Sequence, residues 1–215
     1  MKKNSSHWAE IYQKDIDKKG GNLPYVLNKI INLVRKYSNK NVIECGSGTS
    51  VVSIYLAMLG YNVTAIDIED DVIKLAKSLA KDYYKTIDNP NPQIIFEKKN
   101  ILDLGYEKDS FDVAFSNGVL EHFSDDEIIQ IIKQQLYVAK TVIVGIPTKY
   151  FDSSEAKYGN ERVLELSYWR YLIEKAGGSI IEEIGMDRES FLKRLFNYKK
   201  YFRPKPYHLF VIKNN

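Results

Sequence analysis

The chain has 215 residues, of which 44% are hydrophobic, and a formal net charge of +3 at pH 7. This length suits one domain with a sizeable core, the weak charge disfavours nucleic acid as a partner, and no apolar run approaches the roughly 20 residues that a membrane span needs. The basic N-terminus lacks the apolar centre of a signal peptide, and a single cysteine excludes an intrachain disulfide, so we expect a soluble cytoplasmic protein.

Residues 7–35 carry an apolar pattern of helical period that a glycine pair interrupts. Trp8 and Tyr12 fall on one face of its first half. We therefore expect one or two helices, which form an arm over residues 1–38. The simplest role for the aromatic side chains is to pack this arm against the rest of the domain.

The sequence Asn-Val-Ile-Glu-Cys-Gly-Ser-Gly-Thr-Ser at 41–50 leads into residues 51–59, which are apolar enough for a buried helix. This order predicts a strand, a glycine turn and a helix. Gly46 and Gly48 permit backbone torsions closed to other residues, and a helix start offers unpaired N–H groups with a partial positive charge. We therefore expect a polar ligand to lie against this turn.

The spacing of the glycines separates two classes of ligand. A dinucleotide site has a third glycine three residues after the second, where this chain has Val51. Glu44, two residues before the first glycine, suits a pyrophosphate poorly, but its carboxylate can accept a hydrogen bond from a cationic amino group.

A second strand, predicted over residues 61–67, ends in Asp67, where a carboxylate can accept both hydroxyls of a ribose. Ile68 would then offer an apolar face to an adenine ring. The acids at 69–71 are predicted to cap and charge the start of a helix over 72–84. Among these acids, only Asp67 is predicted to bind a ligand.

A third strand is predicted over 93–96 and a fourth over 110–115. The fourth runs into Ser-Asn-Gly-Val-Leu-Glu-His-Phe at 116–123. This order places Asn117 at the carboxyl end of a central strand, next to the glycine turn. Ligands of open α/β sheets bind at that end.

The remaining residues predict the elements that complete the sheet. They are a capped helix at 124–138, a strand at 141–147, a polar aromatic loop at 148–166, a helix at 167–176 and strands at 179–185 and 207–213. The fold class is therefore α/β: a Rossmann-like, seven-stranded, mostly parallel sheet with an antiparallel edge strand and helices on both faces. Substrate contacts are expected in the loop at 148–166.

Three motifs occur in order with suitable spacing: Glu44-x-Gly46-x-Gly48, then Asp67, then the Phe-Asp-Val strand that enters Val-Leu-Glu-His. Together they resemble the class I S-adenosylmethionine-dependent methyltransferases of the small-molecule type, over essentially the whole chain. The resemblance implies one domain at 1–215, made of the arm at 1–38, a cofactor-binding core at 39–147 and a substrate-side part at 148–215. The chain departs from the family pattern at Ser50, often a glycine, and at Asn100, often an acid.

The resemblance also implies S-adenosyl-L-methionine as the cofactor and suggests which residues hold it. The implied contacts are Glu44 with the methionine amine, Gly46 and Gly48 through the main chain, Asp67 with the ribose, Ile68, Asn100 and Ile101 with the adenine, and Asn117 and Tyr12 with the methionine end. Asp103 is the alternative to Asn100. No metal site is predicted.

His122 is the candidate catalytic residue, as a general base toward a hydroxyl or amine acceptor. Methyl transfer from a sulfonium needs little acid or base help, because the leaving thioether is neutral and in-line positioning of the nucleophile supplies most of the rate. We therefore favour a structural or positioning role for His122, with general base catalysis as the alternative.

The predicted reaction is methyl transfer to a small-molecule acceptor by in-line displacement. The alternatives are an RNA or protein methyltransferase, a non-catalytic cofactor-binding regulator and, disfavoured by Val51, a nicotinamide dehydrogenase. Basic and aromatic residues alternate at 191–205, as at some nucleic-acid surfaces, but such a run is more often a solvated helix face. We expect neither nucleic acid nor a membrane as partner, and the sequence makes no prediction of the oligomeric state.

Overall fold

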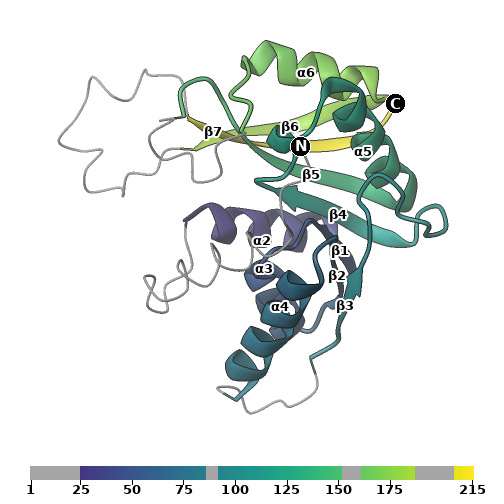
Figure 1. The fold of residues 1–215 in the computed structure, drawn as a ribbon. Coiled ribbons are helices and arrows are strands. Elements are labelled where there is room, and N and C mark those ends of the chain that lie inside the picture. The colour runs from purple at the N-terminus through teal and green to yellow at the C-terminus, as the bar shows by residue number, and fades with distance from the viewer. Residues whose placement is uncertain (1–24, 86–91, 152–160, 187–205) are drawn as a thin grey trace.

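The computed structural model describes residues 25–85, 92–151, 161–186 and 206–215, which form a seven-stranded sheet flanked by helices (Figure 1). The helices are α2 (Tyr25–Tyr37), α3 (Val51–Met58), α4 (Asp70–Tyr84), α5 (Asp125–Val138), α6 (Leu166–Lys175) and the short 3-10 helix η1 (Leu120–His122). The strands are β1 (Asn41–Cys45), β2 (Asn62–Asp67), β3 (Ile94–Lys98), β4 (Phe111–Asn117), β5 (Ala139–Pro147), β6 (Gly178–Met186) and β7 (Tyr207–Asn214).

The strands lie in the order β3-β2-β1-β4-β5-β7-β6. Strands β1 to β5 are parallel, and β7 runs antiparallel to both β5 and β6. The strand order reverses between β1 and β4, and this is the point where α/β sheets of this kind bind ligands. The predicted fold class is confirmed, and the antiparallel strand β7 lies one position inside the edge, which β6 forms.

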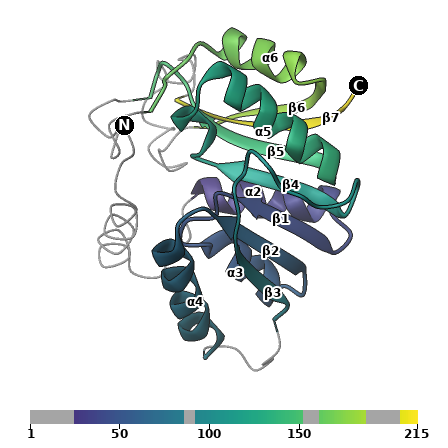
Figure 2. The same ribbon diagram turned by 45° about the vertical axis from the view of Figure 1, so that its right-hand side comes forward.

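The sheet separates two apolar cores. Val42 of β1 packs with α2 and α3 on one face, whereas its neighbour Ile43 packs with α5 and α6 on the other. Because successive side chains of a strand point to opposite faces, a sheet covered on both faces requires strands that are apolar almost throughout. Figure 2 shows α5 and α6 together near β5, β6 and β7, with α4 at the opposite end of the sheet.

Asp112, near the beginning of β4, fixes the start of β1. Its Oδ2 accepts hydrogen bonds from the main-chain N–H groups of Asn39, Lys40 and Asn41 at 3.1, 2.9 and 3.1 Å. Its Oδ1 accepts from Nζ of Lys140 at 3.1 Å. Burial opposes ionisation of this carboxyl, but the hydrogen bonds outweigh it and hold the pKa of Asp112 below its ordinary value.

The starts of α5 and α4 differ in capping. Ser124 caps α5 as predicted, because its hydroxyl accepts from the N–H of Glu127, whose carboxylate accepts from the N–H of Ser124. Glu69 occupies the N-cap position of α4 but makes no side-chain cap hydrogen bond. The acids there place favourable charge in the first turn, as predicted, but the expected side-chain cap is absent at Glu69.

Helix α2 is the described part of the predicted arm. The rest of that arm, including Trp8 and Tyr12, lies outside the described residues. Within the ranges that the structure describes, no helix is long and apolar enough to cross a bilayer.

Candidate functional site

The turn between β1 and α3 has the left-handed backbone that its glycines predict. Gly46 and Gly48 have φ of 71° and 52°. The N–H groups of Gly46 and Ser47 both donate to the carbonyl of Ile66, at 2.9 and 2.8 Å. The turn is therefore tied to the end of β2.

Ser50, where the family pattern often has glycine, also has a positive φ, of 55°. Its N–H donates to the carbonyl of Ser47 at 2.7 Å, and its hydroxyl donates to the hydroxyl of Ser47 at 2.9 Å. These two hydrogen bonds offset part of the strain of a left-handed serine. The departure from glycine is thus compensated locally.

Gly46 also lets the turn after β1 contact the loop after β4. A Cβ added at Gly46 would lie 2.8 Å from Cγ2 of Val119, which is closer than side-chain carbons approach. Glycine is therefore required here for both backbone conformation and packing.

Glu44 lies in β1 directly before this turn, and only 6% of it is exposed. The hydroxyl of Ser53, in α3, donates to Oε2 of Glu44 at 2.5 Å. Burial raises the pKa of Glu44 to about 8, and the nearby Asp67 carboxylate adds to the shift, while the Ser53 hydrogen bond opposes it. A group of this kind becomes fully charged when a cation arrives beside it.

Asp67 ends β2 as predicted, and its carboxylate reaches back to the glycine turn. Its Oδ2 accepts from the N–H of Gly48 at 3.0 Å, and its Oδ1 accepts from the N–H of Glu69 at 3.2 Å. Burial raises the pKa of Asp67 despite these hydrogen bonds. Ile68, the next residue, is 54% exposed and presents an apolar surface next to this acid.

The loop after β3 lies beside Asp67, because the N–H of Lys99 donates to the Asp67 carbonyl at 2.9 Å. Oδ1 of Asn100 already accepts from the N–H of Leu102 at 3.0 Å, which leaves it one further lone pair. The Ile101 side chain is 7% exposed and packs in the core. The Ile101 side chain therefore faces inward, whereas Asp103, the alternative to Asn100, is exposed.

Asn117 lies at the end of β4, and its side chain contacts the last strand. The hydroxyl of Tyr207 donates to Oδ1 of Asn117 at 2.9 Å. A Cβ on Gly145 of β5 would overlap this same oxygen, so a side chain there would displace the amide. Enclosure of the Tyr207 hydroxyl raises its pKa well above the ordinary value.

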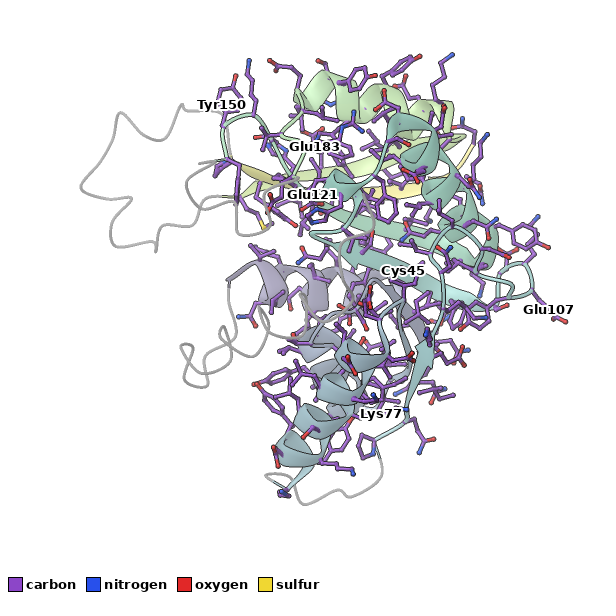
Figure 3. The ribbon with its side chains drawn as sticks, viewed as in Figure 1. Cys45, Lys77, Glu107, Glu121, Tyr150 and Glu183 are labelled. Carbon is purple, nitrogen blue, oxygen red and sulfur yellow. The ribbon has the colours of Figure 1, made fainter. Side chains whose placement is uncertain are left out.

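The loop after β4 continues into η1, which holds Glu121 and His122. The His122 ring is half-buried. Glu121 is 4% exposed, and burial raises the pKa of its carboxyl to about 8, with a further contribution from Glu161. Glu121 follows the carboxyl end of the central strand β4, and Figure 3 shows Glu107 far from it on the other side of the molecule.

The structure brings Glu44, Asp67 and Asn117 to neighbouring strand ends, with the glycine turn and the loop at 99–103 beside them. Tyr12 lies outside the described residues. Sequence reasoning missed Ser53, Glu121 and Tyr207 as site residues. Glu121 stood in the Val-Leu-Glu-His stretch and could have been chosen there as a carboxyl in an otherwise apolar turn.

Metal chemistry finds no support in the described ranges, where no cluster of three or more His, Cys, Asp or Glu side chains could hold an ion. What the fold and the site define is an α/β protein with a left-handed glycine turn, the buried carboxyl of Glu44 and the half-buried carboxyl of Asp67 at the point where the strand order reverses.

A family model described as a methyltransferase domain matches residues 36–177. The chain belongs to this family, and the predicted membership of the class I S-adenosylmethionine-dependent methyltransferases is confirmed.

Relatives and a solved structure agree with this family. A phosphoethanolamine N-methyltransferase from Plasmodium falciparum is 25% identical in an alignment 210 residues long, and the match covers 80% of this chain and 72% of that protein. Phosphoethanolamine N-methyltransferase 1 from Zea mays is 29% identical over 108 residues, which cover 50% of this chain but only 20% of the maize protein. The chain thus matches about a fifth of the length of such plant relatives.

Among solved structures, magnesium protoporphyrin IX methyltransferase from Synechocystis PCC 6803, with bound S-adenosylhomocysteine, superposes with a TM-score of 0.69. It is 16% identical, and the superposition covers 98% of this chain and 93% of that one. At this identity the likeness concerns the fold alone.

Proposed function

We propose that the protein transfers a methyl group from S-adenosylmethionine to a small-molecule acceptor by in-line displacement. The observation that carries this proposal is the pair of carboxyls, the buried Glu44 and the half-buried Asp67, at the ends of adjacent parallel strands around a left-handed glycine turn. The donor supplies a methyl group activated by a positive sulfur.

The residues present fit this donor. The buried Glu44 carboxyl suits the ammonium of the methionine part, and Asp67 suits the ribose hydroxyls. The exposed Ile68 would cover one face of the adenine, and the main chain at Asn100 and Ile101 would meet its edge. Asn117 would border the methionine moiety, and Tyr12, from the arm, is proposed at the same end.

The chain's part in the reaction is to position the acceptor and to exclude water. His122 ends the short helix η1 that follows β4 and would orient the acceptor, with proton removal as the alternative role. We also propose a cytoplasmic location, which the single cysteine favours. An RNA or protein acceptor and a non-catalytic regulator are the alternatives, and the segment 191–205 on which they depend lies outside the described residues.

A thermal shift series with S-adenosylmethionine, S-adenosylhomocysteine and NAD tests the proposal. Ligand at about a hundred times its Kd adds roughly 2.7 kcal/mol to the free energy of unfolding. The two adenosyl compounds should stabilise the protein and NAD should not; stabilisation by NAD alone would refute the methyl donor.

A variant pair tests the ribose contact in the same assay. Asp67→Ala should weaken S-adenosylmethionine by about ten- to a hundredfold, because two hydroxyls lose their acceptor. Asp82→Ala removes an exposed carboxyl from α4 and should leave the affinity unchanged. Unchanged affinity in Asp67→Ala would rule out the ribose contact.

A further inference from the structure

Glu121 is a buried acid that the donor contacts above do not use. Its carboxyl lies against the main chain at the end of β4, since a Cβ added at Gly118 would be 3.6 Å from its Oε1. Gly118 directly follows Asn117, which is proposed to border the methionine moiety. The Glu121 carboxyl therefore lies next to the strand end at which the methionine moiety is proposed.

The Glu121 carboxyl is only partly satisfied, since the one hydrogen bond that opposes its raised pKa comes from its own main chain. Oε2 of Glu121 has no hydrogen-bond partner among the described residues. The Glu121 main chain is held, because its carbonyl accepts from the N–H of Arg162 at 2.9 Å. A buried carboxyl oxygen without a partner costs free energy, so its retention requires an explanation outside the fold itself.

Among the described residues, the charged and titratable groups around Glu121 do not neutralise it. Glu161 is a second acid, and its charge raises the pKa of Glu121 further. The Tyr207 hydroxyl donates to Asn117 instead. The Arg162 guanidinium is engaged elsewhere, with the Phe123 carbonyl and the Asp125 carboxylate, each at 2.6 Å.

The remaining neighbour is His122, whose half-buried ring follows Glu121 in η1. Within the part of the chain that the structure describes, the acids and the tyrosine leave Glu121 without a cation or a strong hydrogen-bond donor at Oε2.

We propose that Glu121 binds the protonated amino group of the methyl acceptor and takes its proton, so that the acceptor class is a small primary or secondary amine. This inference rests on the proposed methyl transfer. The ammonium supplies the N–H donor and the positive charge that Oε2 of Glu121 does not find among the described residues.

The step balances in atoms and charge. One N–H bond of the ammonium breaks and its proton moves to the Glu121 carboxylate, which leaves a lone pair on nitrogen. That lone pair forms a bond to the methyl carbon while the carbon–sulfur bond breaks, and its electron pair stays on sulfur. The products are an N-methylated ammonium, S-adenosylhomocysteine and a protonated Glu121, which then returns its proton to water.

The raised pKa of Glu121, about 8, agrees with this role, because a carboxylate with a high proton affinity can accept a proton from an ammonium. Amine turnover should rise with pH toward about 8, as the free carboxyl ionises. Glu121→Gln should lack this rising limb, since an amide does not titrate.

The test compares matched amines and alcohols as acceptors. The probes are 2-aminoethyl phosphate with 2-hydroxyethyl phosphate, and phenethylamine with phenethyl alcohol, each with S-adenosylmethionine and detection of S-adenosylhomocysteine. At least one amine should be methylated in preference to its alcohol. Glu121→Gln should lower kcat/KM for that amine by about 30-fold or more, which is the loss expected when a buried charge pair is broken.

Two controls separate this role from a structural one. Glu107→Gln makes the same chemical change at an exposed acid far from the site and should keep wild-type turnover (Figure 3). Glu121→Gln should bind S-adenosylhomocysteine within twofold of wild type and unfold at an equal or higher temperature, because it removes an unpaired buried acid.

The outcomes are distinct. Preference for alcohols, no turnover of any amine by protein that binds the donor, or wild-type amine turnover in Glu121→Gln would overturn the inference. Failure of the wild-type protein to bind either adenosyl compound would instead overturn the proposed function.

Discussion

Glu44 and Glu121 are two buried acids near the carboxyl ends of the central strands β1 and β4, and burial raises the pKa of each to about 8. Their surroundings differ. The Ser53 hydroxyl already donates to Glu44, whereas one oxygen of Glu121 has no hydrogen-bond partner among the described residues. Both acids are mostly neutral at pH 7 in the free protein, so each is poised to lose its proton when an ammonium group arrives.

The pH dependence of donor binding should report Glu44. An ammonium favours the ionised carboxyl, so binding releases a proton and the affinity for S-adenosylhomocysteine should rise from pH 6 to 8, by up to about tenfold per pH unit, and level off above about 8. Isothermal titration calorimetry in buffers of different ionisation enthalpy would measure both the affinity and the number of protons released.

Glu44→Gln should bind more weakly and lose most of this slope. A wild-type affinity that is flat over this range would contradict the ammonium contact.

The pH dependence of folding stability has the opposite sign: a folded-state pKa raised above the ordinary 4.5 stabilises the protein at low pH, and this contribution is lost as the pH rises toward 8. The contribution of Glu44 and Glu121 should therefore make the free protein unfold more readily at pH 8 than at pH 6.

The positions of several candidate site residues were predictable because a short local motif marks each of them. Glu44 and Asp67 each lie at a strand end next to a turn, and short motifs locate such ends. Ser53 depends on the rotation of α3 relative to β1, and Tyr207 is 90 residues from Asn117, so their contacts depend on packing that no local pattern contains.

At the scale of the elements, the junction of β1 and β4 is held from both ends. At the carboxyl ends, the Gly46 turn contacts Val119. At the opposite ends, Asp112 collects three main-chain N–H groups that precede or begin β1. The Phe-Asp-Val stretch therefore contributes to the position of the site through the register of the strands.

Asp112→Asn should lower the free energy of unfolding by about 1 to 3 kcal/mol, because an amide replaces charged acceptors at a buried position and brings its own N–H group toward other donors. Urea denaturation would measure this. Asp103→Asn, at an exposed position, should change it by less than about 0.5 kcal/mol. Equal stability of the two variants would show that the Asp112 hydrogen bonds contribute little.

Element type followed from the sequence more closely than element limits. The predicted third and fourth strands extend to Lys98 and Asn117 in the structure, past the ends of their apolar runs. Pairing with neighbouring strands supplies the extra hydrogen bonds, so tertiary contacts determine where these strands end. The place of β7 inside the edge likewise depends on pairing, which local periodicity does not report.

At the scale of the whole molecule, the proposed donor and acceptor sides belong to different halves of the sheet. Glu44 and Asp67 lie on β1 and β2, whereas Glu121 and His122 follow β4. The contact of Gly46 with Val119 joins the two sides. Because this contact is tight, binding on the donor side should also restrain the loop after β4.

Hydrogen exchange should detect this coupling. S-adenosylhomocysteine should slow amide exchange at residues 46–50 and 67–69 and also at 118–123, because the second loop packs on the first. Amides of β6, the edge strand that β5 and β7 separate from β4, should exchange at an unchanged rate. Protection confined to 46–69 would mean that the two loops respond independently.

The position of β7 between β5 and β6 has a consequence for folding. Strand β6 pairs with β7 alone among the described strands, and β7 pairs with β5 across about 60 residues of chain. Until β7 arrives, β5 and β6 each present an open row of hydrogen-bonding groups, and closing so distant a pair is slow. Refolding intermediates that lack β7 should therefore be the species most prone to aggregate, and high protein concentration should reduce the refolding yield before it affects the native state.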